Sequence, residues 1–159
     1  MTEDEARELE RWVRRNGDGV RFVPRSCPTV SVELVAALRR GEIVAMQGDR
    51  ALGSRGDILV PFFGRPAPFP MGPFLLARAA GVAVVPAFCL LGPDYRYAVT
   101  AGDPLTVRAG GEAEAVRAWV ALLEDVVRRH PTQWFNFFDV WNPSRAADPV
   151  PPPPRPTPA

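Results

Sequence analysis

The sequence predicts an α/β fold, with a mixed sheet flanked by helices, because helical and strand-like patterns alternate along the chain. Two helix–strand units, at residues 29–46 and 72–91, each place an amphipathic stretch before a short apolar run. A third amphipathic stretch, at residues 112–129, predicts a long helix. These patterns indicate one domain over residues 1–142. The ending at 143–159 is proline-rich, and we expect it to be a disordered tail.

Local signals give the boundaries of the expected elements. Expected helices end at glycines, as at Gly41 and Gly81, and expected strands are short apolar runs between turn residues. Residues 64–70 are rich in proline, which cannot donate to a sheet ladder, so we expect no regular structure there. The expected helices are 2–16, 29–40, 72–80 and 112–129, and the expected strands are 20–23, 42–46, 58–63, 82–91 and 95–100.

The composition narrows the classes of protein to which the chain can belong. Hydrophobic residues make up 47% and charged residues 23%, which excludes a wholly disordered chain. The formal net charge of +1 gives no reason to expect a nucleic-acid partner. Cys27 and Cys89 are too few for a disulfide framework or a metal site, and they fit a reducing, cytoplasmic compartment. No apolar run approaches the ~20 residues that span a bilayer, so we expect any membrane contact to be peripheral.

Three polar residues follow directly on predicted strands and are candidates for a binding site. Arg25, Asp49 and Arg50 stand in these positions. Ligands in α/β folds gather at the carboxyl ends of strands, so we expect these side chains to converge at one edge. All 19 basic residues are arginine, whose guanidinium binds phosphate through two hydrogen bonds, although codon bias is the simpler explanation of this composition.

Three segments, in chain order, resemble sequence blocks of the glycerolipid and lysophospholipid acyltransferase superfamily. They are Gly19-Val20-Arg21-Phe22-Val23-Pro24-Arg25, Gln47-Gly48-Asp49-Arg50 and Val84-Val85-Pro86. Within that superfamily the chain is most similar to the lipid A biosynthesis acyltransferases, which load lauroyl or myristoyl chains. Further matching residues are Gly41-Glu42, Phe62-Phe63-Gly64, Pro70, Gly72, Leu76-Ala77 and Pro131-x-Gln133-Trp134. The resemblance covers about residues 10 to 142.

The resemblance implies roles for particular residues. Arg25 and Arg50 are expected to hold an anionic group of the acyl acceptor. Asp49 is expected to accept a hydrogen bond from an acceptor hydroxyl or to orient an arginine, and it is the candidate catalytic residue. Gly48, Gly64 and Gly72 are expected to let the backbone approach the substrate. The simpler alternatives are solvated loop arginines, a turn aspartate and turn glycines.

The resemblance also implies a general base that this sequence does not show. In that family a histidine, followed five places later by Asp or Glu, takes the proton of the acceptor hydroxyl. The single histidine here, His130, stands at the end of the long predicted helix, and position 135 is Phe. We therefore expect the chain to be the C-terminal two-thirds of an acyltransferase domain, with an incomplete, N-terminally truncated fold.

The expected function is acyl transfer from acyl-ACP or acyl-CoA to a hydroxyl of a glycolipid or phospholipid. The reaction would take place on the inner face of the cell membrane, with no metal or organic cofactor, and the base would come from a longer product or a partner chain. Two alternatives stay open: a pseudoenzyme that binds lipid or a partner, and a vestigial fragment. The aromatic stretch at 134–141 also has two interpretations, a strand closing the core or a lipid-contacting surface.

Overall fold

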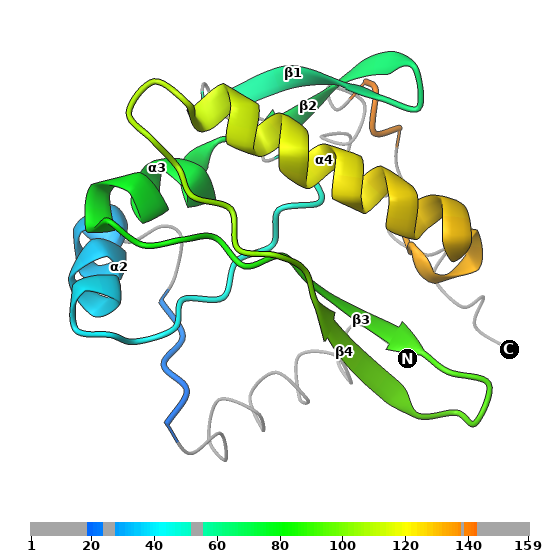
Figure 1. Cartoon of the computed structure of the whole chain (residues 1–159), viewed down its shortest axis with the longest axis horizontal. Coiled ribbons are helices and arrows are strands. Elements are labelled where there is room, and N and C mark those ends of the chain that lie inside the picture. The colour runs from blue at the N-terminus through cyan, green and yellow to red at the C-terminus, as the bar shows by residue number, and fades with distance from the viewer. Residues whose placement is uncertain (1–18, 24–27, 52–55, 138, 143–159) are drawn as a thin grey trace, which may run out of the picture. The chain divides into compact units, whose positions relative to one another are not determined.

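The computed structural model describes residues 19–23, 28–51, 56–137 and 139–142. The chain divides into two compact units, residues 1–34 and 35–159, with the boundary inside the first described helix. The predicted helix at 2–16, the predicted tail at 143–159 and Arg25 lie outside the described residues. In chain order the elements are α2 (Val30–Arg39), β1 (Asp57–Phe62), β2 (Arg65–Pro70), α3 (Gly72–Ala80), β3 (Ala87–Leu91), β4 (Tyr97–Ala101), α4 (Glu112–Arg129) and the 3-10 helix η1 (Pro131–Gln133) (Figure 1).

The described part of the first unit consists of residues 19–23 and 28–34, which include the beginning of α2. The strand predicted at 20–23 is wrong: these residues form no strand, and Val20 is 59% exposed. A strand needs a neighbouring strand to pair with its backbone, and both sheets of the described chain form elsewhere. Glu33 in α2 accepts a hydrogen bond from the Thr29 hydroxyl at 2.7 Å and lies 3.6 Å from the Arg21 guanidinium.

A tight antiparallel hairpin, β1–β2, replaces the irregular segment that the sequence predicted at residues 64–70. The prediction was wrong because the prolines fall at every second position. Pro61 lies opposite Pro66, and Pro68 and Pro70 follow at the same spacing. Since neither member of the first pair has an N–H group, all of these positions are the non-hydrogen-bonded ones of the ladder. The missing donors therefore point away from the partner strand and cost no ladder bond.

The turn of this hairpin uses two residues with left-handed backbones. Phe63 has a φ of 50° and Gly64 a φ of 76°, the pair of positive values that a type I′ turn needs. The turn therefore places Phe62 opposite Arg65 and sets the register of the whole hairpin.

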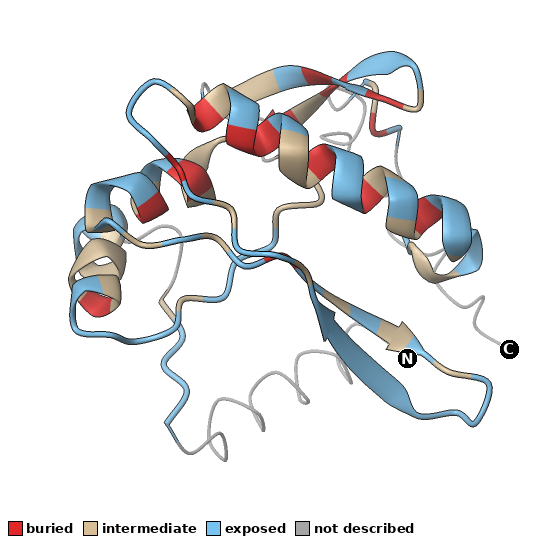
Figure 2. Ribbon diagram, viewed as in Figure 1, coloured by how far each residue is buried: buried red, intermediate tan, exposed pale blue. Residues whose placement is uncertain are grey.

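The core of the second unit lies between the β1–β2 hairpin and α4. Figure 1 shows α4 running along this hairpin, and Figure 2 shows its buried stripe. The predicted helical stripe is confirmed, since Val116, Val120, Leu123 and Val127 are all buried. The hairpin and α3 contribute further buried side chains: Val60, Phe62, Ala67, Phe69, Phe74 and Ala77.

The second hairpin, β3–β4, is shorter than the sequence predicted. The strand expected at 82–91 begins at Ala87, after an isolated bridge between Val84 and Leu105. Pro86 interrupts the ladder because it has no N–H group, although its carbonyl accepts a bond from the Gly102 N–H at 2.8 Å. The strand predicted at 42–46 is wrong: this segment is irregular, and Ile43 is 96% exposed.

The α/β class is confirmed by these helices and strands. Within the described residues the strands pair as two separate antiparallel hairpins rather than as a single mixed sheet. The difference follows from the two irregular segments, 20–23 and 42–46, which would have supplied further strands. The helix ends are as predicted: Gly41 and Gly81 adopt left-handed conformations after α2 and α3, with φ of 83° and 74°.

Candidate functional site

The segment that carries Gly48, Asp49 and Arg50 is fastened to the middle of α4. The indole N–H of Trp119 donates a 3.0 Å hydrogen bond to the Gly48 carbonyl oxygen. The indole ring also lies against the Gly48 backbone, so that a Cβ atom at position 48 would meet the Trp119 Nε1 at 3.2 Å. Glycine at this position therefore has a structural reason, which is to let the backbone approach a tryptophan side chain.

Asp49 and Arg50 form a carboxylate–guanidinium pair immediately after this anchor. The Arg50 Nη2 lies 3.8 Å from the Asp49 Oδ2, with side-chain exposures of 41% and 27%. At this distance the two charges attract each other, and both side chains keep partial access to solvent. The pair thus presents a hydrogen-bond acceptor for hydroxyl groups beside a hydrogen-bond donor for anionic oxygens.

The other predicted glycines occupy different parts of the second unit. Gly64 is exposed in the β1–β2 turn, and Gly72 is the first residue of α3. No heavy atom lies within 4 Å of a Cβ built at either position, so both offer open space at the backbone. Arg25, the remaining predicted binding residue, lies outside the described residues. The roles of these residues in substrate binding stay predictions.

The β1–β2 turn is also fastened to α4, nearer to the C-terminal end of that helix. Glu124 accepts a 2.8 Å hydrogen bond from the Phe63 N–H, and it pairs with Arg128 one helical turn later. The Arg128 guanidinium in turn lies over the Phe63 ring, 5.3 Å from its centroid. A single helix therefore positions both family-like segments, 47–50 and 62–64.

Sequence reasoning missed this role of α4. Trp119 was visible as one member of an apolar stripe, and Glu124 as an ordinary polar position of the helix. The signal that could have found them is chemical: a tryptophan keeps one N–H group that needs a partner when the ring is half-buried. A carboxylate next to a buried stripe can accept from a turn whose own backbone bonds are incomplete.

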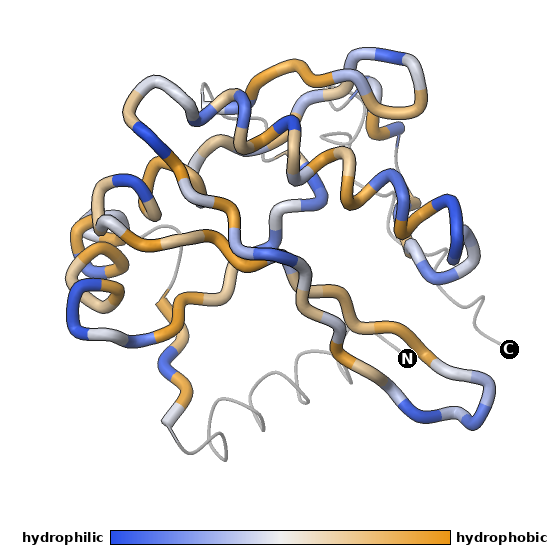
Figure 3. Tube along the Cα trace, viewed as in Figure 1, coloured by the Kyte–Doolittle hydropathy of each residue, from blue (hydrophilic) through white to orange (hydrophobic). Residues whose placement is uncertain are grey.

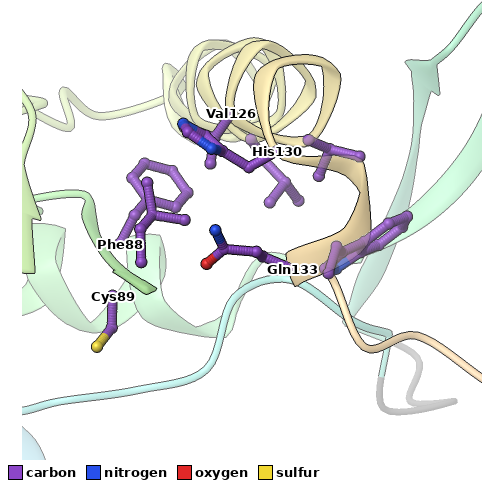
Figure 4. Close-up of a pocket in the computed structure, with 9 residues that line it drawn as sticks. Phe88, Cys89, Val126, His130 and Gln133 are labelled. Carbon is purple, nitrogen blue, oxygen red and sulfur yellow. The ribbon is translucent and has the colours of Figure 1, made fainter. Parts of the chain in front are cut away.

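A small apolar hollow of about 90 Å³ lies between β3 and the C-terminal end of α4 (Figure 4). His130 lines it together with Phe88 and Val126, and the Cys89 sulfur points away from His130 (Figure 4). Ligand pockets usually measure ~300–1,000 Å³, so this hollow is too small for an acyl chain. His130 caps the end of α4, where its backbone N–H donates to the Val126 carbonyl at 2.9 Å, so its predicted position at the end of this helix is confirmed.

A larger hollow of about 440 Å³ lies at the other end of α4, between its first turns and residues 104–108. Arg108 and Glu114 are its charged lining residues, and both are exposed. Its volume falls in the ligand range, but it involves none of the predicted site residues.

The aromatic stretch at 134–141 forms no strand in its described residues, 134–137 and 139–141, so the strand interpretation was wrong. Trp134 and Trp141 pack against the core, and the indole N–H of Trp141 donates a 3.1 Å hydrogen bond to the Phe62 carbonyl. Phe135 and Phe137 point outward, 70% and 91% exposed, with ring centroids 6.4 Å apart. The stretch therefore closes the core with its tryptophans and exposes a pair of phenylalanines.

Comparison with known proteins identifies the family of this chain. Residues 8–142 match the family described as bacterial lipid A biosynthesis acyltransferase. The chain belongs to this family. The match includes the Gly48–Arg50 segment, the β1–β2 hairpin, β3 and α4, so the described core and its anchored segments are parts of the family's domain.

Two relatives from Mycobacterium tuberculosis share part of this lipid A acyltransferase-like sequence. The phosphatidylinositol mannoside acyltransferase of strain CDC 1551 / Oshkosh is 28% identical over 109 residues, which are 68% of this chain and 34% of the relative. The protein of the same name from strain ATCC 25618 / H37Rv is 29% identical over 105 residues, 65% of this chain and 32% of the relative. The chain thus spans about a third of the length of the curated relatives it matches.

The described residues contain neither a membrane-spanning helix nor a cluster of metal-binding side chains. None of the helices there combines the length and the apolar character needed to cross a membrane. In the same part of the chain, no three or more His, Cys, Asp and Glu side chains gather into a group that could hold a metal ion.

Proposed function

We propose that this chain supplies the acceptor-binding part of a lipid acyltransferase. The reaction would move a fatty acyl group from acyl-ACP or acyl-CoA to a hydroxyl of an anionic glycolipid or phospholipid. The observation that carries the proposal is the anchored Gly48–Arg50 segment, where a carboxylate and a guanidinium lie 3.8 Å apart in the region matched to the family.

The two side chains suit the two chemical features of such an acceptor. Arg50 offers a planar set of N–H donors to a phosphate, and the partial exposure of its side chain leaves it accessible. Asp49 can accept a hydrogen bond from a sugar or glycerol hydroxyl, or hold the guanidinium in place. The relatives are named for a phosphatidylinositol mannoside, which carries both a phosphate and sugar hydroxyls, and this favours a lipid of that class as the acceptor.

The transfer step needs a general base besides these residues. The acceptor oxygen attacks the thioester carbonyl carbon, the C–S bond breaks, and the hydroxyl proton passes through the base to the leaving thiolate. The one histidine of this chain, His130, lies at the end of α4 beside the small apolar hollow. We therefore propose that the base comes from a longer product or from a partner chain, as the sequence led us to expect.

We also propose that the protein works at the inner face of the cell membrane. The support is the exposed phenylalanine pair, Phe135 and Phe137, since aromatic side chains favour the boundary between lipid and water.

The test measures the affinity of a short-chain phosphatidylinositol mannoside for the whole chain by NMR titration. We expect Asp49→Ala and Arg50→Gln each to weaken binding by about tenfold or more, because hydrogen bonds to charged groups are the stronger ones. The matched controls are Asp94→Ala and Arg96→Gln, which alter a second carboxylate–guanidinium pair with the same 3.8 Å separation on an exposed turn. Equal effects in the two pairs would contradict the proposal.

A non-catalytic lipid-binding role is the second candidate, favoured by the position of the single histidine. The two candidates differ in the native product. The intact mass of the protein isolated from its own cells, with an acyl-transfer assay on that material, separates them. An active product, or an active complex with a second chain, supports acyl transfer. A product of this length that binds the lipid and transfers nothing supports the binding role.

A further inference from the structure

We infer that Trp119 is a positioning residue for Asp49 and Arg50, acting through the backbone of Gly48. The inference rests on the proposed function, because it concerns the same segment, and it adds a residue outside that segment. It also gives α4, which carries one buried stripe of the core, a direct part in the site.

The contact controls the orientation of the peptide unit next to Asp49. The Trp119 N–H bonds the Gly48 carbonyl oxygen at 3.0 Å. Because the peptide group is planar, fixing this oxygen also fixes the Asp49 N–H and restrains the position of the Asp49 Cα atom. The indole ring also lies close to the Gly48 backbone, since its Nε1 and Cε2 atoms would lie 3.2 and 3.3 Å from a Cβ at position 48.

The indole ring also contacts β3. The Phe88 ring stacks on it, with centroids 5.3 Å apart and an interplanar angle of 10°. Phe88 lies in β3, two residues after Pro86, so the ring joins the segment at 47–50 to the strand that follows the family-like Val84-Val85-Pro86. Trp119 thus contacts both the segment at 47–50 and β3, and its neighbours on the helical stripe, Val116 and Leu123, are buried.

The Trp→Phe series separates positioning from simple packing. Trp119→Phe removes the donor and keeps an aromatic ring against Phe88. Its matched control is Trp134→Phe, because the buried Trp134 Nε1 has no hydrogen-bond partner among the described residues. We expect Trp119→Phe to weaken binding of the short-chain phosphatidylinositol mannoside by about fivefold, the effect of one hydrogen bond. Trp134→Phe should leave this affinity unchanged.

A second variant tests the same contact from the other side and covers the case in which Trp119→Phe does not fold. Gly48→Ala places a methyl group 3.2 Å from the Trp119 Nε1 and should push the segment away. Gly102→Ala is its control, because the added Cβ would lie 3.5 Å from Pro86, an ordinary contact distance. We expect Gly48→Ala, and not Gly102→Ala, to weaken lipid binding by about fivefold.

The spectroscopic readout is the set of backbone amide shifts of Asp49, Arg50 and Ala51, recorded with and without lipid. Positioning predicts that Trp119→Phe and Gly48→Ala move these shifts and lower the affinity together. If both variants only reduce thermal stability, with affinity and shifts unchanged, Trp119 is a packing residue and the inference is overturned. The proposed function survives that result as long as Asp49→Ala and Arg50→Gln still weaken binding. If these two variants bind normally, the proposed function fails, and with it any role of Trp119 in the site.

Discussion

The two hairpins of the second unit have the same topology and opposite burial. Each is a pair of antiparallel strands. In β1–β2, Val60, Phe62, Ala67 and Phe69 are all buried, whereas β3 and β4 contain no buried residue (Figure 2). Hydropathy does not explain the contrast, since β3 is hydrophobic along its whole length (Figure 3). What differs is the set of side chains from other elements that pack on each hairpin and bond to it.

Polar anchors fasten β1–β2 where its apolar face meets α4. Glu124 accepts from the Phe63 N–H, and Trp141 donates to the Phe62 carbonyl. A two-stranded hairpin is marginal by itself, so packing against a helix is what makes it stable. The anchors also fix where the hairpin sits on α4, because they bond to backbone groups at the turn end of the ladder.

Within the part of the chain that the structure describes, the β3–β4 hairpin is attached to other elements through the Phe88 ring and through the backbone edge of β3. Phe88 stacks on Trp119, and Gln133 bonds the backbone of Leu91. The opposite face is formed by alternate residues of both strands, and all of them are exposed: Ala87, Cys89, Leu91, Tyr97, Val99 and Ala101. The comparison predicts that substitutions in the two hairpins differ in size by several-fold, even between residues of the same chemical kind.

The largest expected difference is between an aromatic residue of each hairpin. Phe62 is 0% exposed and its ring contacts those of Phe63, Phe69 and Trp134 at 4.7 to 5.4 Å. Phe62→Ala should therefore lower the free energy of unfolding by about 3–5 kcal/mol. Tyr97→Ala removes a side chain that is 73% exposed and should change it by less than about 0.5 kcal/mol. Urea denaturation of both variants checks the prediction, and similar midpoints would contradict it.

A smaller effect is expected at the anchor between α4 and the β1–β2 turn. Glu124→Ala leaves the Phe63 N–H without its acceptor, and should lower the free energy of unfolding by about 1.5 kcal/mol. Asp125→Ala is the matched control, because Asp125 makes the same i,i+4 pair with an arginine but is 62% exposed. Exposed pairs of this kind contribute about 0.3–0.5 kcal/mol. Chemical denaturation would refute the role of the anchor if the two variants lost equal stability.

The contrast also shows which elements of the fold could be predicted from the sequence. The helices α3 and α4 and the strand β1 are set by local signals: Gly72-Pro73, Gly81 and the stripe through Val116 were sufficient. The strand β2 was missed because proline content was weighed without its spacing, and only the register shows that every second position tolerates proline. The segments at 20–23 and 42–46 looked like strands because strand formation depends on partners that a local pattern does not reveal.

The candidate site could be predicted only in part, because local signals show the residues of a segment but not the distant residues that contact it. The adjacent pair Asp49 and Arg50 could be singled out from a polar turn after an apolar run. The partner that holds this turn, Trp119, is 71 positions from Gly48, and no sequence pattern pairs a helix tryptophan with one particular carbonyl. Contacts of this type depend on how the elements pack, which local propensity does not specify.

The smallest expected effect concerns the two hydrogen bonds that join Gln133 of η1 to the backbone of Leu91 in β3. Gln133 accepts from the Leu91 N–H at 2.7 Å and donates to the Leu91 carbonyl at 3.0 Å, so its amide takes the place of a neighbouring strand. Gln133→Leu should speed hydrogen exchange at Leu91 by about fivefold, because one hydrogen bond contributes about 1 kcal/mol. Gln133→Glu keeps the acceptor and loses the donor, so its effect should be intermediate. Amides of Val60 and Phe62 should keep their exchange rates in both variants. If they also exchange faster, the two hairpins unfold as one unit and the contrast drawn between them fails.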